Sequence, residues 1–141
     1  MDKFQIIALT PPGLSDPAIA IAAGRADAIG VFDLALVKND KDARDGLEKL
    51  KQHARNPFGV RFDWRNHALI SAVDPLLPEQ TGYVILSGAG GEGLADWVKT
   101  FRDKGIVVLW ECPSAGHGRY GREAGVDGLI AKGNEAGGWV G

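Results

Sequence analysis

The sequence lacks the features that mark disulfide-bonded, zinc-binding or membrane-spanning proteins. Its single cysteine, Cys112, cannot form an internal disulfide, and no Cys/His cluster has the spacing of a zinc site, so we expect no metal. The longest apolar stretches, such as residues 19–24 and 106–110, are far shorter than the roughly 20 residues that a membrane helix needs. The first residues show no secretory signal pattern. We therefore expect a cytoplasmic protein without membrane contact, in which Cys112 is an inert buried thiol.

The sequence also lacks a marked excess of either charge. Sixteen Lys and Arg residues stand against eighteen Asp and Glu residues, which gives a net charge of -2, and the basic residues are scattered along the chain. Nucleic-acid-binding surfaces need a basic stripe or patch, so we expect no nucleic-acid partner. With 141 residues, 45% of them hydrophobic, the chain has the size and composition of one globular domain.

Short apolar runs rich in Val and Ile recur between helical patterns, as in parallel strands that are joined by helices. Their starts lie about 20 to 30 residues apart, which is the length of one βα unit. Six strands are predicted, at residues 4–9, 28–32, 58–62, 83–87, 106–110 and 128–131. Helices are predicted at residues 16–24, 41–55 and 93–104, with a short or degenerate helix within residues 63–81. Six parallel strands fit either an open doubly wound sheet or a (β/α)8 barrel, and the spacing alone does not decide between them.

The most informative segment follows the last predicted strand. Lys132 comes directly after it, and glycines then occupy positions 133, 137, 138 and 141. Backbone N–H groups of such a loop can converge on an anion without obstruction by side chains. In barrels the ligand binds at the carboxyl ends of the strands, where Lys132 and Glu135 fall. The loop therefore predicts a phosphate site, with a tight turn of no further role as the alternative.

This segment carries a family resemblance. Residues 133–138 read Gly-Asn-Glu-Ala-Gly-Gly and resemble the Gly-x-Glu-Ala-Gly-Gly motif after the sixth strand of the nitronate monooxygenase (2-nitropropane dioxygenase) family of FMN-dependent barrels. The preceding Lys132 makes the motif most similar to the subgroup associated with polyketide and polyunsaturated fatty acid synthases. Residues 56–61, Asn-Pro-Phe-Gly-Val-Arg, also look like the family's third strand, Pro-Phe-Gly-Val-Asn. The resemblance implies an α/β fold, a partial (β/α)8 TIM barrel of about six βα units with parallel strands, whose C-terminal part is missing.

The resemblance also implies which residues contact the cofactor, FMN. It places Lys132 against the flavin ring or ribityl chain, Gly137 and Gly138 near the phosphate, and residues 11–13 beside the isoalloxazine. The full implied set is Pro11, Gly13, Arg61, Lys132, Gly133, Glu135, Ala136, Gly137 and Gly138.

Two positions depart from the family pattern. The family's catalytic histidine follows the two glycines, where this chain has Trp139, and its flavin-contacting asparagine is Arg61 here. An oxidation that begins with proton abstraction needs a base near the flavin, which puts the family's activity in question. Arg61 could favour the anionic reduced flavin, hold an acidic substrate or form an ordinary salt bridge. His117 is an alternative acid/base candidate or a solvated loop histidine, and Glu111 faces the pocket or forms a structural ion pair.

A complete barrel of this kind has about 250 residues. We therefore expect residues 1–141 to be the N-terminal portion of one FMN-binding barrel domain in a longer chain, with further domains of the same polypeptide as partners. The implied function is an FMN-dependent oxidoreductase acting on a small-molecule or carrier-bound acyl substrate. Enoyl reduction on carrier-linked chains of a polyketide or fatty acid synthase is favoured. The alternatives are a nitronate monooxygenase proper, a non-catalytic structural remnant of the barrel, and a phosphate-sugar barrel enzyme without flavin.

Overall fold

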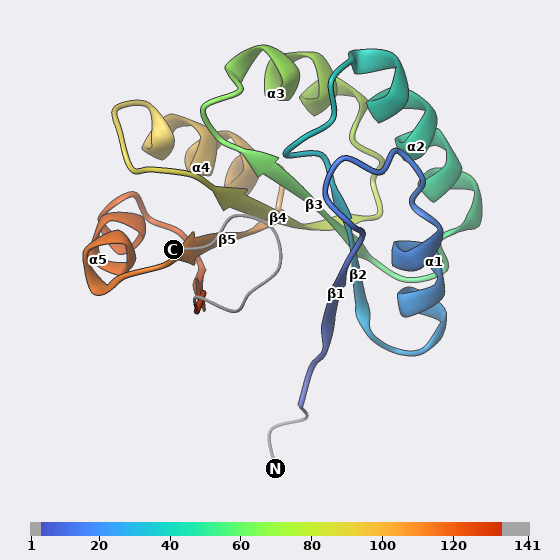
Figure 1. The fold of residues 1–141 in the computed structure, drawn as a ribbon, viewed down its shortest axis with the longest axis horizontal. Helices are drawn as coiled ribbons and strands as arrows, with labels where there is room; N and C mark the ends of the chain where they lie inside the picture. Colours follow the sequence, from blue (N-terminus) through green and yellow to red (C-terminus); the bar gives the residue numbers. More distant parts are fainter. Residues whose placement is uncertain (1–3, 134–141) are drawn as a thin grey trace.

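A computed structural model describes residues 4–133 of the chain. Its six strands form one parallel sheet in which each strand pairs with the next in the sequence, in the order β1 to β6 (Figure 1). The strands are β1 (Ile7–Leu9), β2 (Ile29–Asp33), β3 (Phe58–Asp63), β4 (Thr81–Ser87), β5 (Val107–Cys112) and β6 (Gly128–Ala131). A doubly wound sheet reverses its strand order at a switch point, whereas a barrel keeps the sequence order throughout. The sequential order therefore identifies a partial (β/α)8 barrel, as predicted.

Helices connect the strands and lie together on the outer side of the curved sheet (Figure 1). They are α1 (Ala18–Arg25), α2 (Asp40–His53), α3 (His67–Val73) with a following 3-10 turn η1 (Asp74–Leu76), α4 (Leu94–Asp103) and α5 (Ala115–Glu123). The prediction of a short third helix within residues 63–81 is confirmed. Two prolines, Pro75 and Pro78, follow α3, and a proline ring clashes with a continuing helix.

Helix α5 was not predicted, because glycines at positions 116, 118 and 121 have low helix propensity. Two local features offset that cost. The side chain of Ser114 caps the helix by accepting a hydrogen bond from the backbone N–H of His117. Gly121 lets the helix approach the Trp110 ring so closely that a Cβ at this position would overlap it. Tertiary packing therefore overrides propensity in this segment.

The hydrophobic core lies between the outer face of the sheet and the helices. Alternate strand residues point to this face, and in β3 they are Phe58, Val60 and Phe62, each almost fully buried. They pack in one cluster with helix residues such as Leu47 and Phe101. The residues between them, Gly59 and Arg61 in β3, therefore point to the inner face of the sheet, which corresponds to the interior of a barrel.

The two outer strands leave apolar side chains in contact with solvent. Ile6, next to β1, is 61% exposed, and Leu129 in β6 is 50% exposed. Among the described residues, β1 pairs with β2 alone and β6 with β5 alone. Open sheet edges with apolar side chains favour pairing with additional chain segments. This half-barrel therefore exposes the surfaces that further strands of a barrel would cover.

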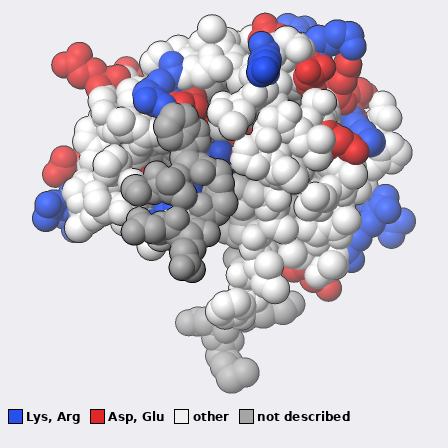
Figure 2. Space-filling view, in the orientation of Figure 1, with Lys and Arg blue, Asp and Glu red and all other residues white. Residues whose placement is uncertain are grey.

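The charged side chains follow a simple distribution on the face seen in Figure 1. In Figure 2, Lys and Arg intermingle with Asp and Glu around the rim of the molecule. None of the helices within residues 4–133 is long and apolar enough to cross a bilayer. In the same residues, no group of three His, Cys, Asp or Glu side chains is arranged to hold a metal ion.

Candidate functional site at the carboxyl ends of the strands

Polar residues gather where the strands end. Asp33, Asp63 and Ser87 are the last residues of β2, β3 and β4, Glu111 is the next-to-last residue of β5, and Lys132 directly follows β6. The carboxyl ends of the parallel strands lie at one rim of a barrel, which is where (β/α)8 enzymes bind their ligands. The described half-barrel therefore carries a polar rim at the end where a ligand is expected.

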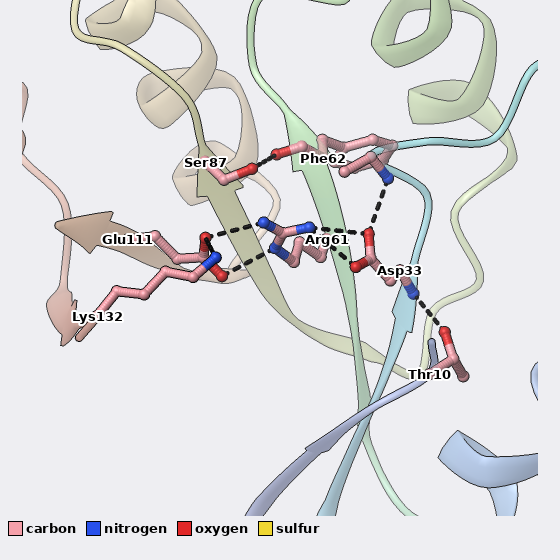
Figure 3. Close-up of polar contacts among 8 residues, drawn as sticks. Thr10, Asp33, Arg61, Phe62, Ser87, Glu111 and Lys132 are labelled. Atoms are coloured by element: carbon pink, nitrogen blue, oxygen red, sulfur yellow. Dashed lines mark hydrogen bonds and ion pairs between the residues drawn. The ribbon is translucent and has the colours of Figure 1, made fainter. Parts of the chain in front are cut away.

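At the centre of this rim lies Arg61, whose side chain is held by two carboxylates (Figure 3). Its Nε and Nη2 atoms donate to the two carboxylate oxygens of Glu111 at 2.8 and 2.9 Å. Its Nη1 atom donates to the two oxygens of Asp33 at 3.1 and 2.9 Å. The Arg61 side chain is only 3% exposed and those of Asp33 and Glu111 are 2% and 10% exposed. The result is a buried carboxylate–guanidinium–carboxylate group of Asp33, Arg61 and Glu111 that links β2, β3 and β5. We call it the Arg61 group.

The strand register explains why these three side chains meet. Asp33 and Arg61 are directly paired positions of β2 and β3, so both point to the inner face of the sheet. Arg61 pairs with Ile85, which in turn pairs with Leu109, so Glu111 lies one inward position further along β5. The long arginine side chain spans β4 and reaches the Glu111 carboxylate.

Asp33 is fixed in turn by the first strand and by its own loop. Its backbone N–H donates to the Thr10 hydroxyl oxygen at 2.8 Å, and its Oδ1 atom accepts from the backbone N–H of Ala35 at 2.9 Å. Thr10 is 1% exposed, so this contact is also shielded from solvent. The Arg61 group is therefore anchored to backbone on the β1–β2 side.

Burial and charge pairing act in opposite directions on Arg61. Burial is the largest single influence and lowers its pKa, because it disfavours the charged guanidinium. The hydrogen bonds that Arg61 donates to Glu111, the charge of Asp33 and the remaining carboxylate interactions together outweigh burial, so the pKa of Arg61 lies above its usual value. Arg61 consequently stays protonated, and its positive charge remains paired with the carboxylates of Asp33 and Glu111.

Lys132 adds a second cation to the same group. Its Nζ atom lies 3.5 Å from Oε2 of Glu111, and its side chain is 10% exposed. Asp33 and Glu111 carry two negative charges against the single positive charge of Arg61, and the Lys132 ammonium brings the sum to zero. A buried group with balanced charge avoids the large desolvation cost of an unpaired ion.

These contacts bear on which residues fit an anionic cofactor such as FMN. Every nitrogen of the Arg61 guanidinium already donates to a carboxylate, so Arg61 forms the salt bridge that the sequence left open, and its contact with the flavin stays a prediction. Lys132 does fit, since an ammonium has three N–H donors and Glu111 is its one ion-pair partner within residues 4–133. Beside it, a Cβ on Gly133 would meet no atom of the described residues within 4 Å, so these residues leave the backbone at this point open to a ligand.

The remaining residues of the implied FMN set lie on other segments. Pro11 and Gly13 are exposed in the loop between β1 and α1, where Leu14 N–H donates to the Pro11 carbonyl at 3.2 Å and Gly13 adopts a φ of +78°. That positive φ favours glycine over any other residue. Glu135, Ala136, Gly137 and Gly138, together with Trp139, fall outside the described residues.

His117 and Cys112 lie beside α5. His117 is in the first turn of that helix and not in a loop, and its Nδ1 atom lies 2.9 Å from the Ser114 hydroxyl. It lines a small hollow with Gly90, Gly91, Glu92, Gly116 and Tyr120. Cys112 is half-buried instead of fully buried, and its thiol donates to the Ile130 carbonyl at 3.3 Å.

Sequence reasoning did not single out Asp33 or Thr10. The signal for Asp33 was present, because an aspartate directly after the apolar run Ile29–Phe32 is costly unless it is paired. Thr10 carries no such signal, since a threonine that follows a strand is common in loops. Only the register between β1 and β2 brings it to the backbone N–H of Asp33.

Comparison with known proteins shows similarity at the level of structure. No protein-family model matches the sequence, and no curated protein is significantly similar to it. Among solved structures, the M276A mutant of FabK from Thermotoga maritima matches with a TM-score of 0.76 and 26% identity, over 97% of this chain and 46% of that one. A second structure of FabK from Thermotoga maritima matches with a TM-score of 0.76 and 23% identity, over 97% and 43% of the two chains.

A nitroalkane oxidase from Streptomyces ansochromogenes is similar as well, with a TM-score of 0.75 and 19% identity over 94% of this chain and 47% of the oxidase. The chain thus spans less than half the length of each of these three structures. Residues 4–133 form six of the strands of such a barrel, with their parallel sequential order. The half-barrel fold and these likenesses fit the nitronate monooxygenase family, which the sequence motifs resemble.

Proposed function

We propose that this chain forms the N-terminal portion of the FMN-binding barrel of an oxidoreductase. The observation that carries the proposal is the position of Lys132 at the carboxyl end of the six-stranded half-barrel, where its ammonium is largely buried and has N–H donors available. The half-barrel is similar in structure to FabK and to a nitroalkane oxidase. The exposed edges at β1 and β6 support the further proposal that additional strands of the same polypeptide complete the barrel.

In this proposal the chain's own residues bind and orient the cofactor. Lys132 holds an electronegative part of FMN, and the glycines of residues 133–138 present backbone N–H groups to its phosphate. Pro11 and Gly13 line the isoalloxazine. FMN, when bound, supplies the capacity to accept and donate a hydride. The buried side chains of Asp33, Arg61 and Glu111 form the inner wall of the proposed site and exclude water from that side.

The proposed substrate is an enoyl thioester on a carrier-linked acyl chain. The support comes from the sequence, in which Lys132 precedes the Gly-Asn-Glu-Ala-Gly-Gly segment as in the synthase-associated subgroup, and in which Trp139 replaces the family's catalytic histidine. Enoyl reduction needs a hydride and a proton donor, and it needs no base that abstracts a substrate proton. Oxidation of a neutral nitroalkane does need that base, because its α-carbon must lose a proton. A comparison of turnover of a neutral nitroalkane with reduction of an enoyl thioester tests the assignment, and fast nitroalkane oxidation would contradict it.

The first test of cofactor binding is the visible absorption spectrum of the full-length protein, before and after addition of FMN. We expect a protein-bound flavin band. Lys132→Ala and Gly137→Val should each weaken FMN binding, whereas Lys41→Ala should not, because Lys41 is exposed on α2 and pairs with Asp45. Unchanged flavin affinity in both site variants would remove the site assignment, and no flavin binding by the wild-type protein would remove the proposed function.

A non-catalytic remnant of the barrel is the second candidate. The observation in its favour is that Arg61, at the position of the family's flavin-contacting asparagine, is occupied by Asp33 and Glu111. A remnant binds FMN weakly or not at all and shows no reduction of the flavin by a nicotinamide donor. A phosphate-sugar enzyme without flavin, the remaining alternative, binds phosphate without acquiring a visible band.

A further inference from the structure

We propose that Glu111 is a positioning residue whose carboxylate holds the Lys132 ammonium inside the barrel rim, ready to bind an anionic ligand group. The inference rests on the proposed function, because the ligand in question is FMN. It concerns a residue that the family motif does not include.

The first step of the argument is that the Glu111 carboxylate is immobilised. Both of its oxygens accept hydrogen bonds from Arg61, at 2.8 and 2.9 Å, and Arg61 is itself held by Asp33. Asp33 is tied to Thr10. Figure 3 shows this series of contacts running from β1 across the sheet to the end of β6. The sheet sets the positions of these partners, so together they hold the Glu111 carboxylate in one fixed position.

The second step is that the carboxylate determines where the Lys132 side chain lies. Ala131 and Gly133, on either side of Lys132, are exposed, yet the lysine side chain is only 10% exposed. A lysine at a strand end ordinarily extends its flexible stem so that the ammonium reaches water. Here the ammonium lies 3.5 Å from Glu111 instead, and the uncompensated negative charge of the Asp33–Arg61–Glu111 group accounts for its inward position.

The third step is that this pairing leaves the ammonium available. At 3.5 Å the Nζ–Oε2 contact is long for a charge-assisted hydrogen bond, which typically measures about 2.7–2.9 Å. Glu111 therefore attracts Lys132 by charge and leaves its N–H donors available to a ligand. The geometry therefore suits a cation that is held in place and still donates to a ligand.

A double-mutant cycle tests the inference in the full-length protein. We measure the FMN dissociation constant by flavin fluorescence for the wild type, Glu111→Gln, Lys132→Met and the double variant. Glu111→Gln should weaken FMN binding about tenfold, within the range for residues that orient a ligand-binding side chain. In the Lys132→Met background the same substitution should change the affinity less than twofold. A residue that only stabilises the fold would give equal effects in both backgrounds.

A second measurement needs no flavin, and so separates this inference from the proposed function. We use peptide mass spectrometry to measure the rate at which acetic anhydride acylates Lys132 in the wild type and in Glu111→Gln. Lys41 serves as the internal reference. Release of the ammonium in Glu111→Gln should raise the relative rate of Lys132 about tenfold. Should Glu111→Gln not fold, Glu111→Asp retains the charge but withdraws the carboxylate by one methylene and should show the same trend.

An unchanged acylation rate, or tighter FMN binding in Glu111→Gln, would overturn the inference. Altered acylation in a protein that does not bind FMN would overturn only the proposed function.

Discussion

Arg61 and Glu111 form a bidentate ion pair across β4, with Nε–Oε1 and Nη2–Oε2 distances of 2.8 and 2.9 Å. The pair joins β3 to β5 by side chains alone, since these strands are not neighbours in the sheet. Planar guanidinium and carboxylate groups match in this geometry, which makes the contact directional as well as attractive. Because both partners are nearly inaccessible to solvent, screening by water and salt is weak.

The first prediction is that Arg61→Met strongly destabilises the protein. The substitution retains most of the aliphatic volume but leaves Asp33 and Glu111 without their counter-ion. Removing one partner of a buried ion pair costs about 3–5 kcal/mol. We expect a loss of that size in the free energy of unfolding at neutral pH, measured by urea denaturation with tryptophan fluorescence.

Lys49→Met provides the matched control for this prediction. Lys49 also forms an ion pair, with Asp16 at 2.8 Å, but the two side chains are 48% and 50% exposed. Exposed pairs contribute at most about 1 kcal/mol, so this variant should remain near wild-type stability. Equal losses in the two variants would show that burial does not set the importance of the Arg61 contacts.

The second prediction concerns the dependence of stability on pH through Asp63. The hydrogen bond from Arg65 is the main influence on this carboxyl and lowers its pKa below the ordinary 3.8, and the opposing effect of burial is smaller. Between the two pKa values the unfolded chain binds more protons than the folded one, so stability rises with pH there. The contribution of Asp63 is therefore complete at neutral pH and is lost as the pH falls below about 4 through the folded-state pKa.

Asp63→Asn should consequently lose stability at pH 7 and show a smaller difference in urea midpoint between pH 7 and pH 3 than the wild type. Arg65→Met removes the two side-chain donors and should reduce this difference in the same direction. If Asp63→Asn keeps the full wild-type difference, the acid sensitivity of the fold originates from other carboxylates.

The strands and most helices could be predicted from the sequence because their signals are local. Short apolar runs that contain Val or Ile mark β2 to β6, and the four-three-four spacing of Ala43, Leu47, Leu50 and Ala54 marks α2. Strand β1 is shorter than predicted and begins at Ile7 instead of residue 4. Phe4 is apolar but 92% exposed, which shows that an apolar residue at a sheet edge need not belong to the strand.

The candidate site was predictable only in part, because its geometry depends on contacts between distant residues. Arg61 and Glu111 are 50 positions apart, and no local pattern indicates that they meet. The sequence left open whether Arg61 binds a ligand or forms a salt bridge, and only the register of β2, β3 and β5 brings both carboxylates to it. Lys132 was predictable as a strand-end cation, whereas its pairing with Glu111 was not.

The third prediction is that Gly30→Ala disrupts the packing of α1 against β2. A Cβ at this position would lie 2.8 Å from the Cα of Ala20 and closer still to its carbonyl oxygen. Backbone cannot yield as a flexible side chain does, so we expect a loss of about 3 kcal/mol in unfolding free energy, at the upper end for overpacking. Gly24→Ala lies in α1, where the added Cβ would meet no atom of residues 4–133 within 4 Å, and it should instead be neutral or stabilise by about 0.5 kcal/mol. Similar destabilisation in both variants would contradict the assigned helix–strand contact.

The fourth prediction concerns the glycine-rich loop between β4 and α4, which lies at the same end of the barrel as Lys132. The Tyr120 hydroxyl bonds both to the N–H of Gly91, at 2.8 Å, and to its carbonyl oxygen, and Trp64 donates to the Ala89 carbonyl at 2.6 Å. Each such hydrogen bond contributes about 1 kcal/mol. Tyr120→Phe removes the two bonds to Gly91 and keeps the ring, so amide hydrogen exchange at Gly91 should accelerate roughly tenfold or more.

Amides of β3 provide the internal reference for this experiment, because their hydrogen bonds belong to the centre of the sheet and should exchange at the wild-type rate. A general acceleration that includes β3 would mean that Tyr120 stabilises the whole fold and does not act on this loop alone. Unchanged exchange at Gly91 would mean that the Trp64 contact holds the loop by itself. Only a local acceleration agrees with a loop held from both sides, by α5 through Tyr120 and by the end of β3 through Trp64.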